Sequence, residues 1–585
     1  MIFRFNFGEL SPTLAFENHF CKLPARSVTY LLTHMHLNPL QRAKRKLLKL
    51  FTISLFLPVS VFAQETSGIS FHGNAGVYGE VYSIKGLSAR RPHLTGRAFV
   101  RGNVEWDGFK LPIDIFFSSE DELIRQTINR ISLGYQNNWL DLRAGDAYPM
   151  YSPLLAQGVF LRGVHTTVKT NNVVVQFEGG QNQRAIDGDL KLGRSGMYER
   201  FFWIGKAGYE SPQYFGFVHA LRAKDEIGSI TTPGFFATPQ ENLVVGSQIG
   251  ARFLDNALEA KVEFNRALWT KDIRELPSER GAIPGAFTSL FSERASTMSD
   301  VALRTDISYR TMGTSVSAMY QRAGSEYMTL GVFGFQSDWE EIRLQAYAPL
   351  MNYALNLSGF FSTKHDNLNG SKSATTTRTN GGAQVGYRFN ETYGIQTNYY
   401  FYFDRNDAKT SFSQINQQTH NVMLQGIRDW GEFSERQHLD LSIGYQTVKD
   451  NVVRQFGSFD YSRISLGGNY TRNFSLLFSG YVNYQFGKNK TSFSDVTTHN
   501  AALGVNYAIV QNLTNAGAQL GFSKESAGNG TIDNSQFQMR LFALHRFTTT
   551  LSLQLDIEGT FYSARSGVSI NMTEWRSGIT LTQQF

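Results

Sequence analysis

Residues 551–562, LSLQLDIEGTFY, alternate apolar and polar side chains without interruption. Successive side chains of an extended chain point to opposite faces, so this segment predicts a strand with one apolar and one polar face. Such a strand needs an apolar medium on one side and water or polar groups on the other. The apolar medium is either the core of a soluble sandwich or lipid, and the rest of the sequence must decide between them.

The same alternation recurs along most of the chain, in roughly twenty to twenty-seven segments, many of them about 10–13 residues long. Strands of soluble proteins average about 5–6 residues, whereas a tilted strand that crosses a membrane needs about 9–11. The segment lengths therefore favour lipid. Clear examples are GIQTNYYFYFD (394–404), LDLSIGYQT (439–447), LLFSGYVNYQF (476–486) and FQMRLFALHRF (537–547).

The connections near the C-terminus alternate in length, which is typical of a membrane barrel with short periplasmic turns and longer extracellular loops. A soluble sandwich has no reason to sort its connections in this way. The predicted short connections are 471–473, 510–515 and 548–550, and the predicted long polar ones are 487–498, 524–534 and 563–573.

The final segment, EWRSGITLTQQF (574–585), ends at Phe585 and alternates back from it through Leu581, Ile579 and Trp575, while Gln583 and Ser577 depart from the pattern. In this respect the chain resembles bacterial outer-membrane β-barrel proteins. The resemblance implies that Phe585 is a C-terminal assembly signal read by the barrel-assembly machinery. The abundance of Tyr, Asn, Gly and Phe, with FAQ at 62–64, is similar in composition to barrels of the Bacteroidota.

We therefore expect an all-β fold, a large antiparallel transmembrane β-barrel of roughly 22–26 strands in the outer membrane. No separate plug domain is expected, because residues 69–84 and 93–106 already have the strand pattern. Aromatic rows such as Tyr399, Phe401 and Phe403 suit the interfacial girdles of such a barrel, although ordinary cross-strand packing would also explain them. A soluble secreted β-protein is the structural alternative.

The N-terminal region has the anatomy of a secretory signal peptide. A basic stretch at 42–49 precedes a short apolar run at 50–63, which ends in the small-residue sequence Val-Phe-Ala. We expect residues 1–34 to be a non-native N-terminal extension before Met35, residues 35–63 to be the signal peptide, and residues 64–585 to form the barrel. The only cysteine, Cys21, precedes the mature chain, so neither disulfides nor thiolate chemistry are expected there.

The net charge of +7 belongs mostly to the signal region. Residues 1–63 contain 8 basic and 2 acidic side chains, which leaves 48 basic and 47 acidic in the remainder of the 585-residue chain. A nearly neutral mature chain gives no support for nucleic-acid binding. The expected partners are instead outer-membrane lipid and lipopolysaccharide, with a homo-oligomer or an exported protein as further possibilities.

The stretch 140–164, LDLRAGDAYPMYSPLLAQGVFLRGV, suggests a strand, a tight irregular loop and another strand. In one interpretation it is a folded-in loop or gate in which Asp146 and Arg162 face the lumen. In the other, its Gly and Pro residues only fix the backbone angles of turns.

Residues 272–299 form the longest stretch without a strand pattern. Arg274, Glu275, Glu279 and Arg280 could line an inward constriction loop, since charged loops set the selectivity of pores. A plain extracellular loop is the alternative.

These features predict a channel or transport protein for polar solutes. The alternative is a protein-export or surface-assembly barrel of the usher type, for which 140–164 is the only support. A barrel-embedded hydrolase is a further alternative, with Asp440 or Asp556 beside a histidine as its site. The sequence contains no recognisable catalytic, phosphate-binding or metal-binding motif, so we expect no enzyme activity and no cofactor.

Overall fold

The period-2 segments form one antiparallel sheet of 26 strands that closes on itself. The computed structural model describes residues 68–122, 125–234, 236–278, 290–452, 459–492, 494–566 and 568–585. The predicted extension and signal peptide therefore lie outside the described residues. The strand number falls within the expected range, and the expected fold class is confirmed.

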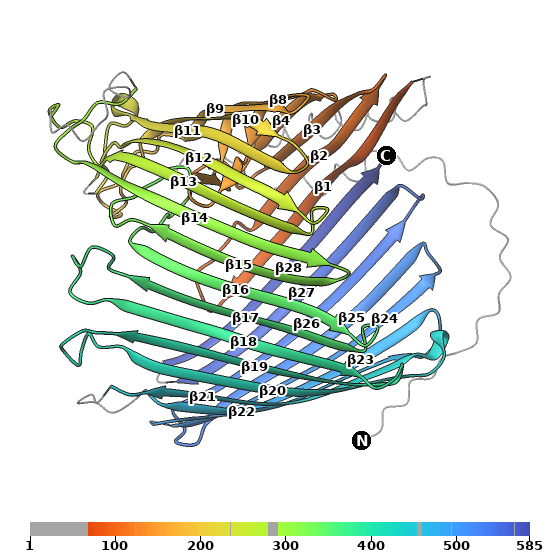
Figure 1. Ribbon diagram of the computed structural model, residues 1–585. Helices are drawn as coiled ribbons and strands as arrows, with labels where there is room; N and C mark the ends of the chain where they lie inside the picture. The colour runs from red at the N-terminus through yellow and green to blue at the C-terminus, as the bar shows by residue number, and fades with distance from the viewer. Residues whose placement is uncertain are drawn as a thin grey trace, which may run out of the picture. The chain divides into compact units, whose positions relative to one another are not determined.

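Figure 1 shows the strands crossing the barrel wall obliquely, each hydrogen-bonded to its neighbours in chain order. The first half of the wall contains β1 (Ile69–Lys85), β2 (Leu94–Trp106), β3 (Phe109–Ser118), β4 (Arg130–Gln136), β5 (Leu140–Ala147), β8 (Leu161–Thr170), β9 (Val173–Gln183), β10 (Glu199–Glu210), β11 (Tyr214–Glu226), β12 (Glu241–Phe253), β13 (Leu258–Thr270), β14 (Thr297–Thr311) and β15 (Thr314–Ala323).

The second half contains β16 (Trp339–Leu350), β17 (Leu355–Asp366), β18 (Thr376–Arg388), β19 (Tyr393–Asn406), β20 (Asn416–Trp430), β21 (Gln437–Asp450), β22 (Tyr461–Asn473), β23 (Phe478–Thr491), β24 (Asp495–Val510), β25 (Thr514–Ala527), β26 (Asp533–Arg546), β27 (Leu551–Ser566) and β28 (Val568–Gln584). Two short strands, β6 (Met150–Ser152) and β7 (Ala156–Gln157), pair only with each other. Single turns of 3₁₀-helix occur at η1 (Ile227–Ser229) and η3 (Phe433–Glu435).

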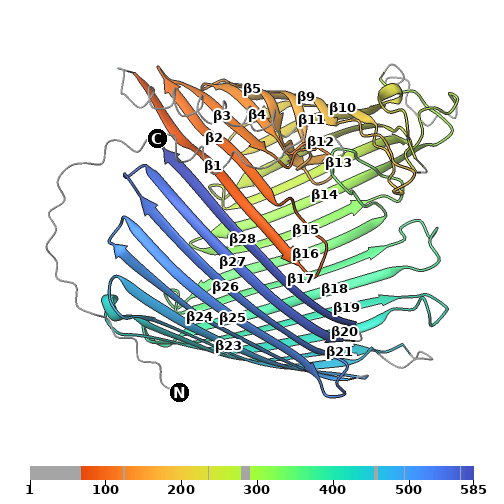
Figure 2. The same cartoon turned by 180° about the vertical axis from the view of Figure 1, so that it is seen from behind.

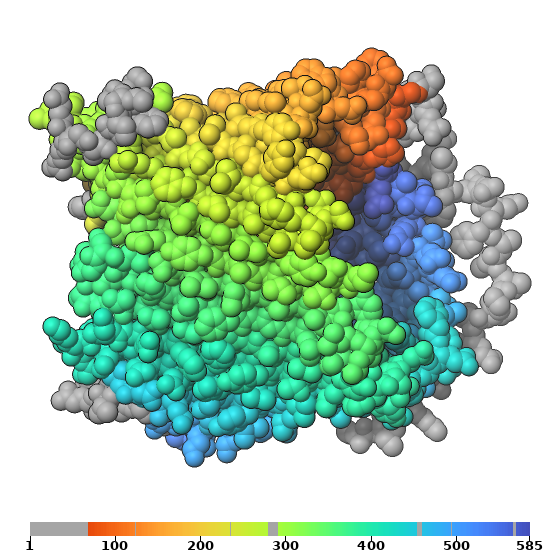
Figure 3. All heavy atoms as spheres, viewed as in Figure 1, coloured from red at the N-terminus to blue at the C-terminus, as the bar shows by residue number. Residues whose placement is uncertain are grey.

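The barrel closes where the first strand meets the last, as Figure 2 shows from behind. β1 pairs with β28 in continuous register from Asn74 opposite Gln584 to Lys85 opposite Thr573. The described strands have no unpaired edge in the wall, which hydrocarbon would not tolerate. The outer surface is continuous on the face that Figure 3 shows. Among the described residues, no helix is long and apolar enough to cross a membrane.

Connections of different length gather at opposite ends of the barrel. At one end lie tight turns such as Asp107-Gly108, whose positive φ angles of 47° and 79° suit a two-residue hairpin. The C-terminus lies at this end, because the amide of Gln584 donates to the carbonyl of Thr550 in the last turn. By the usual arrangement of outer-membrane barrels this end is periplasmic, and the end with the longer loops is extracellular.

The predicted long loops near the C-terminus are an exception to this rule. In the predicted loops 487–498 and 563–573 the strands continue, and Ser566 still pairs with Val568 beyond the expected strand end. Polar residues there extend the hairpins into the extracellular space instead of forming loose loops. The prediction of long loops at these positions was wrong, because polarity alone does not distinguish a solvated hairpin from a loop.

Candidate functional site

The two faces predicted for residues 551–562 lie on opposite sides of the wall. Leu555 and Ile557 of β27 are about 40% exposed on the outer face. Asp556 faces the lumen, where its carboxylate accepts a hydrogen bond from Nε of Arg540 on β26 over 2.8 Å. Isolated charges are costly in hydrocarbon, so the aliphatic face must meet lipid and the charged face must meet the lumen.

The predicted aromatic rows lie on the same outer face. Tyr399, Phe401 and Phe403 of β19 contact one another in sequence, with ring centroids 6.1 and 5.1 Å apart. The Tyr399 hydroxyl hydrogen-bonds to Nδ1 of His420 on the neighbouring strand over 2.9 Å. The row lies near the extracellular end of the wall, where aromatic side chains with a polar partner suit the lipid interface.

The connection between β5 and β8 folds back inside the barrel and packs against its inner wall. Leu154 and Leu155 of this inward loop (148–160) are fully buried. They contact a bed of lumen-facing side chains on β10 to β15, which consists of Phe202, Ile204, Leu221, Ala223, Val244, Ala267, Ala302 and Ala323. The small alanine side chains on four of these strands allow the loop to approach the wall closely.

A second connection, between β15 and β16, lies over the first. Its Tyr327 hydroxyl donates to the carbonyl of Leu154, and the Thr329 hydroxyl donates to the carbonyl of Leu155 over 2.6 Å. Asn242 of β12 anchors this overlying loop (324–338) through its side-chain amide, which donates to the carbonyl of Met328 and accepts from the amide of Leu330. Together the two loops form a dry layer inside one side of the lumen.

A buried polar chain fastens the inward loop to the wall beneath it. The Ser152 hydroxyl donates to Oε1 of Glu263 over 2.6 Å, and the Asn265 amide donates to the same oxygen over 2.7 Å. His219 in turn bonds to Asn265. Hydrogen bonds to a carboxylate are stronger than those between neutral groups. This hydrogen-bond network therefore holds Ser152, and the loop that contains it, at a defined position on the inner wall.

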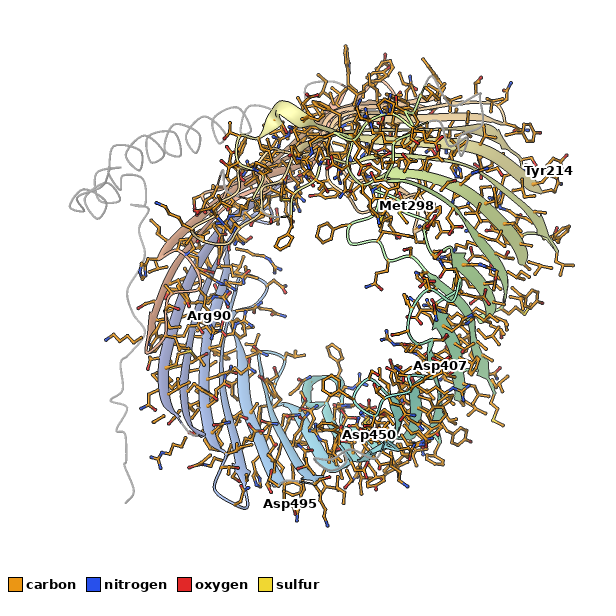
Figure 4. The ribbon with its side chains drawn as sticks, turned by 90° about the vertical axis from the view of Figure 1, so that its left-hand side faces the viewer. Arg90, Tyr214, Met298, Asp407, Asp450 and Asp495 are labelled. Carbon is orange, nitrogen blue, oxygen red and sulfur yellow. The ribbon has the colours of Figure 1, made fainter. Side chains whose placement is uncertain are left out.

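The loops do not fill the lumen. Seen along the axis from the extracellular end, the described chain surrounds an open centre (Figure 4). Charged side chains of the inner wall are held in ion pairs, such as Arg101 with Asp114 at 3.1 Å and Arg304 with Asp306 at 2.7 Å. Barrels of 16–18 strands already enclose an aqueous channel, so a wider barrel can retain one despite two inward loops.

The predicted gate residues Asp146 and Arg162 do lie together, but not in the lumen. Arg162 donates from Nε to Asp146 over 2.6 Å, and the same carboxylate accepts the amide of Ile131 over 2.7 Å. Arg162 follows Leu161, which packs inside against the loops, so strand alternation places Arg162 on the outer face. The prediction that the pair faces the lumen was wrong, although the prediction of a folded-in loop beside it was correct.

Backbone geometry explains part of the sequence pattern in this segment. Gly145 has a φ of 116°, and a Cβ there would lie 1.9 Å from the carbonyl oxygen of Ile131. Only glycine fits this position. Gly145 lies within β5 and not in a turn, so at this position the sequence pattern reflects the close approach of neighbouring strands; the interpretation as turn chemistry stays a prediction.

The described ends of the 272–299 stretch do not form an inward constriction. Phe291 packs on Leu243 and Leu268, which alternate with lumen-facing Asn242 and Ala267 and so lie on the outer face. Arg274 pairs with its neighbour Asp272 at 2.6 Å, and the Glu275 carboxylate accepts the amide of Ser296. The alternative of an extracellular loop fits these contacts, whereas Glu279 and Arg280 lie outside the described residues.

Phe585 takes part in closing the barrel. Its amide donates to the carbonyl of Gly73 over 3.0 Å, and its ring lies 5.1 Å from that of Phe71 on β1. The residue therefore has a structural contact at the seam. Its predicted role as an assembly signal stays a prediction.

The hydrolase alternative singled out Asp440 beside a histidine, and the structure does place His438 there. Nε2 of His438 lies 2.8 Å from Asp440, but Nδ1 lies 2.7 Å from Asp429. Both ring nitrogens are thus bonded to carboxylates, and neither is left to take a proton from a nucleophile. Asp556, the other residue singled out, is bonded to Arg540 and Gln554.

Sequence reasoning missed the overlying loop and the bed beneath both loops. One signal was present: in YFGFVHALRAKDE (214–226), the lumen-facing positions carry Phe215, Phe217, Leu221 and Ala223, where a wetted wall would carry polar residues. Apolar residues on both faces of a barrel strand predict that something covers the inner face.

No family model matches the sequence, and a comparison with curated proteins also finds no match. Among solved structures, OccAB2 of Acinetobacter baumannii has a TM-score of 0.32 at 8% identity, over 64% of this chain and 97% of that one. OccK9 (OpdG) of Pseudomonas aeruginosa has 0.30 at 13%, over 65% and 97%. A BenF-like porin from Pseudomonas fluorescens Pf-5 has 0.30 at 11%, over 64% and 98%.

Similarity this low carries no functional argument, so the identification depends on the chain's own geometry. A closed sheet of 26 strands with an aliphatic exterior and an ion-paired interior is stable only in a membrane. The chain is a large outer-membrane β-barrel.

Proposed function

We propose that this barrel is a passive channel for polar solutes across the outer membrane. The observation that carries the proposal is the open, polar centre that remains after two loops have folded into the barrel. The inward loops narrow the lumen from one side and set the size limit of the solute. Because buried, closely packed side chains hold both loops against the wall, the constriction that they form should be stable.

Planar-bilayer recording tests this proposal directly. Purified protein, inserted in the folded state, should give stepwise ion currents of uniform size. Replacing residues 150–158 by a Gly-Ser linker should enlarge each step, because it removes the buried part of the inward loop. Folded, inserted protein without current, both intact and with this replacement, would contradict the channel function.

Export of a partner protein stays a prediction without a contact that favours it, because the 140–164 segment is accounted for by the inward loop. Co-purification of an exported protein that depends on residues 148–160 would support it. Absence of enzyme activity, recognition by the barrel-assembly machinery, self-association and a Bacteroidota origin also stay predictions.

A further inference from the structure

The lumen presents two chemically different surfaces, and one of them is uncharged. From β20 to β24, opposed lumen-facing positions carry amide side chains in three pairs: Asn421 with Gln446, Asn469 with Asn483, and Gln485 with Asn500. We call these six residues the amide face. Their neighbours in sequence, such as Val422 and Tyr484, are exposed on the lipid side, which indicates that the amides point inward.

The side-chain amides of this face have donors and acceptors that are not used within the protein. Directly opposed side chains on neighbouring strands lie about 4.5–5.5 Å apart at Cβ, close enough to bond to each other. Within the described part of the chain, however, none of the six side chains makes a hydrogen bond to another protein group. All are at least partly exposed, so their donors and acceptors are available to water or to a solute.

Several of the charged groups elsewhere in the lumen are already bonded to each other. Arg540 pairs with Asp556 at 2.7 Å, and Arg576 bridges Glu80 and Glu558 at 3.3 and 3.5 Å. A permeating ion would have to compete with these internal pairs. Two charged side chains border the amide face: Arg463, opposite Gln446, and Asp440, opposite Asn469.

An amide group offers both a donor and an acceptor and carries no net charge. A hydroxyl group is likewise both donor and acceptor, so a chain of sugar hydroxyls can bond repeatedly to a row of amides. Two lumen-facing tyrosines on β19, Tyr400 and Tyr402, add aromatic surface beside the row. They are 41% and 37% exposed, enough for contact with the apolar faces of sugar rings.

We infer that the channel binds neutral polyhydroxylated solutes, of the oligosaccharide class, along the amide face during passage. This inference rests on the proposed channel function and names its substrate class. Weak and repeated binding sites favour passage, because a solute must be able to leave each site as well as enter it.

The experiment measures block of the ion current by maltohexaose, a neutral linear hexasaccharide. In the wild type, the sugar should reduce the potassium chloride current in a saturable manner. The double variant Asn469→Leu/Asn483→Leu removes one opposed pair at similar side-chain size. Loss of one hydrogen bond to the sugar should weaken its apparent affinity about fivefold, measured as the fractional block of each protein's own sugar-free current.

The matched control is Gln418→Leu, which removes an amide from β20 on the outward-facing side, opposite Phe403. It should leave the block unchanged. Current without sugar block, or equal block in the wild type and the double variant, would overturn the inference while the channel function stands. Absence of any current would overturn the channel function and the inference with it.

Discussion

Detaching the inward loop should widen the channel, and the structure sets the size of the effect. Leu154 and Leu155 are completely buried between the loop and the inner wall. Truncation of a buried leucine to alanine costs about 2–5 kcal/mol, so Leu154→Ala/Leu155→Ala should weaken docking of the loop by roughly 4–10 kcal/mol if the two costs add. Even 4 kcal/mol changes the ratio of docked to undocked loop by about a thousandfold.

The assay is single-channel recording combined with limited proteolysis of protein in liposomes. The double variant should show larger unitary conductance, more open-channel noise, and new cleavage within residues 148–160. Its wall should remain folded, because neither leucine belongs to the 26-strand sheet. Heat-dependent gel mobility of the folded form checks this.

Leu192→Ala is the matched control, since Leu192 lies in an extracellular loop and is 70% exposed. Exposed substitutions usually change stability by less than about 0.5 kcal/mol, so this variant should behave as the wild type. Conductance, noise and cleavage that are the same in the double variant and the wild type would refute the view that the docked loop narrows the lumen.

Three further predictions follow from particular contacts. Burial alone would raise the pKa of Asp338, but hydrogen bonds from Lys372, 2.6 Å away, and from backbone amides lower it. A lowered pKa in the folded state stabilises the fold above about pH 4, and this stability is lost as the pH falls through the folded-state pKa. Acid should therefore increase proteolysis of the two loops that Asp338 and Lys372 join. Asp338→Asn should remove this pH dependence. Asp146→Ala removes the acceptor of the Ile131 amide and the ion-pair partner of Arg162, whose guanidinium keeps its hydrogen bond to the Asn129 carbonyl. It should lower the free energy of unfolding by about 1–3 kcal/mol. Unitary conductance should not change, and a changed conductance would indicate that Asp146 faces the lumen. Phe585→Ala loses a ring contact with Phe71 worth about 0.5–1.5 kcal/mol, so a large fall in the amount of protein reaching the outer membrane, with normal conductance after refolding, would support an assembly signal, whereas unchanged amounts would contradict it.

The sequence predicted the wall of the barrel because its physical cause is local. Alternation along each strand depends only on which side of the wall meets lipid, so segments such as 394–404 and 551–562 carry the information within themselves. The number of strands could be predicted as a range for the same reason, because each strand carries its own alternation.

The interior depended on contacts that are distant in sequence. Leu154 and Tyr327 meet although they are 173 residues apart, and no local pattern in either loop specifies the other. Asp146 was misplaced because the local sequence does not show which face of β5 and β8 meets the inward loop. The pairing of Asp146 with Arg162 is regular, and only the burial of Leu161 against the loops identifies their side of the wall as the outer one. The apolar inward face of residues 214–226 was a signal that pattern reading could have used.

The central claim is that water fills the lumen and lipid surrounds the wall, and cysteine labelling along β27 tests it most directly. The chain's single natural cysteine is Cys21, so single substitutions in the barrel can be read against a variant without it. In intact membranes, a charged, membrane-impermeant thiol reagent should modify Gln554→Cys and Asp556→Cys but not Leu555→Cys or Ile557→Cys, and all four should react after denaturation. Equal reactivity at all four positions in membranes, or the opposite alternation, would contradict the account.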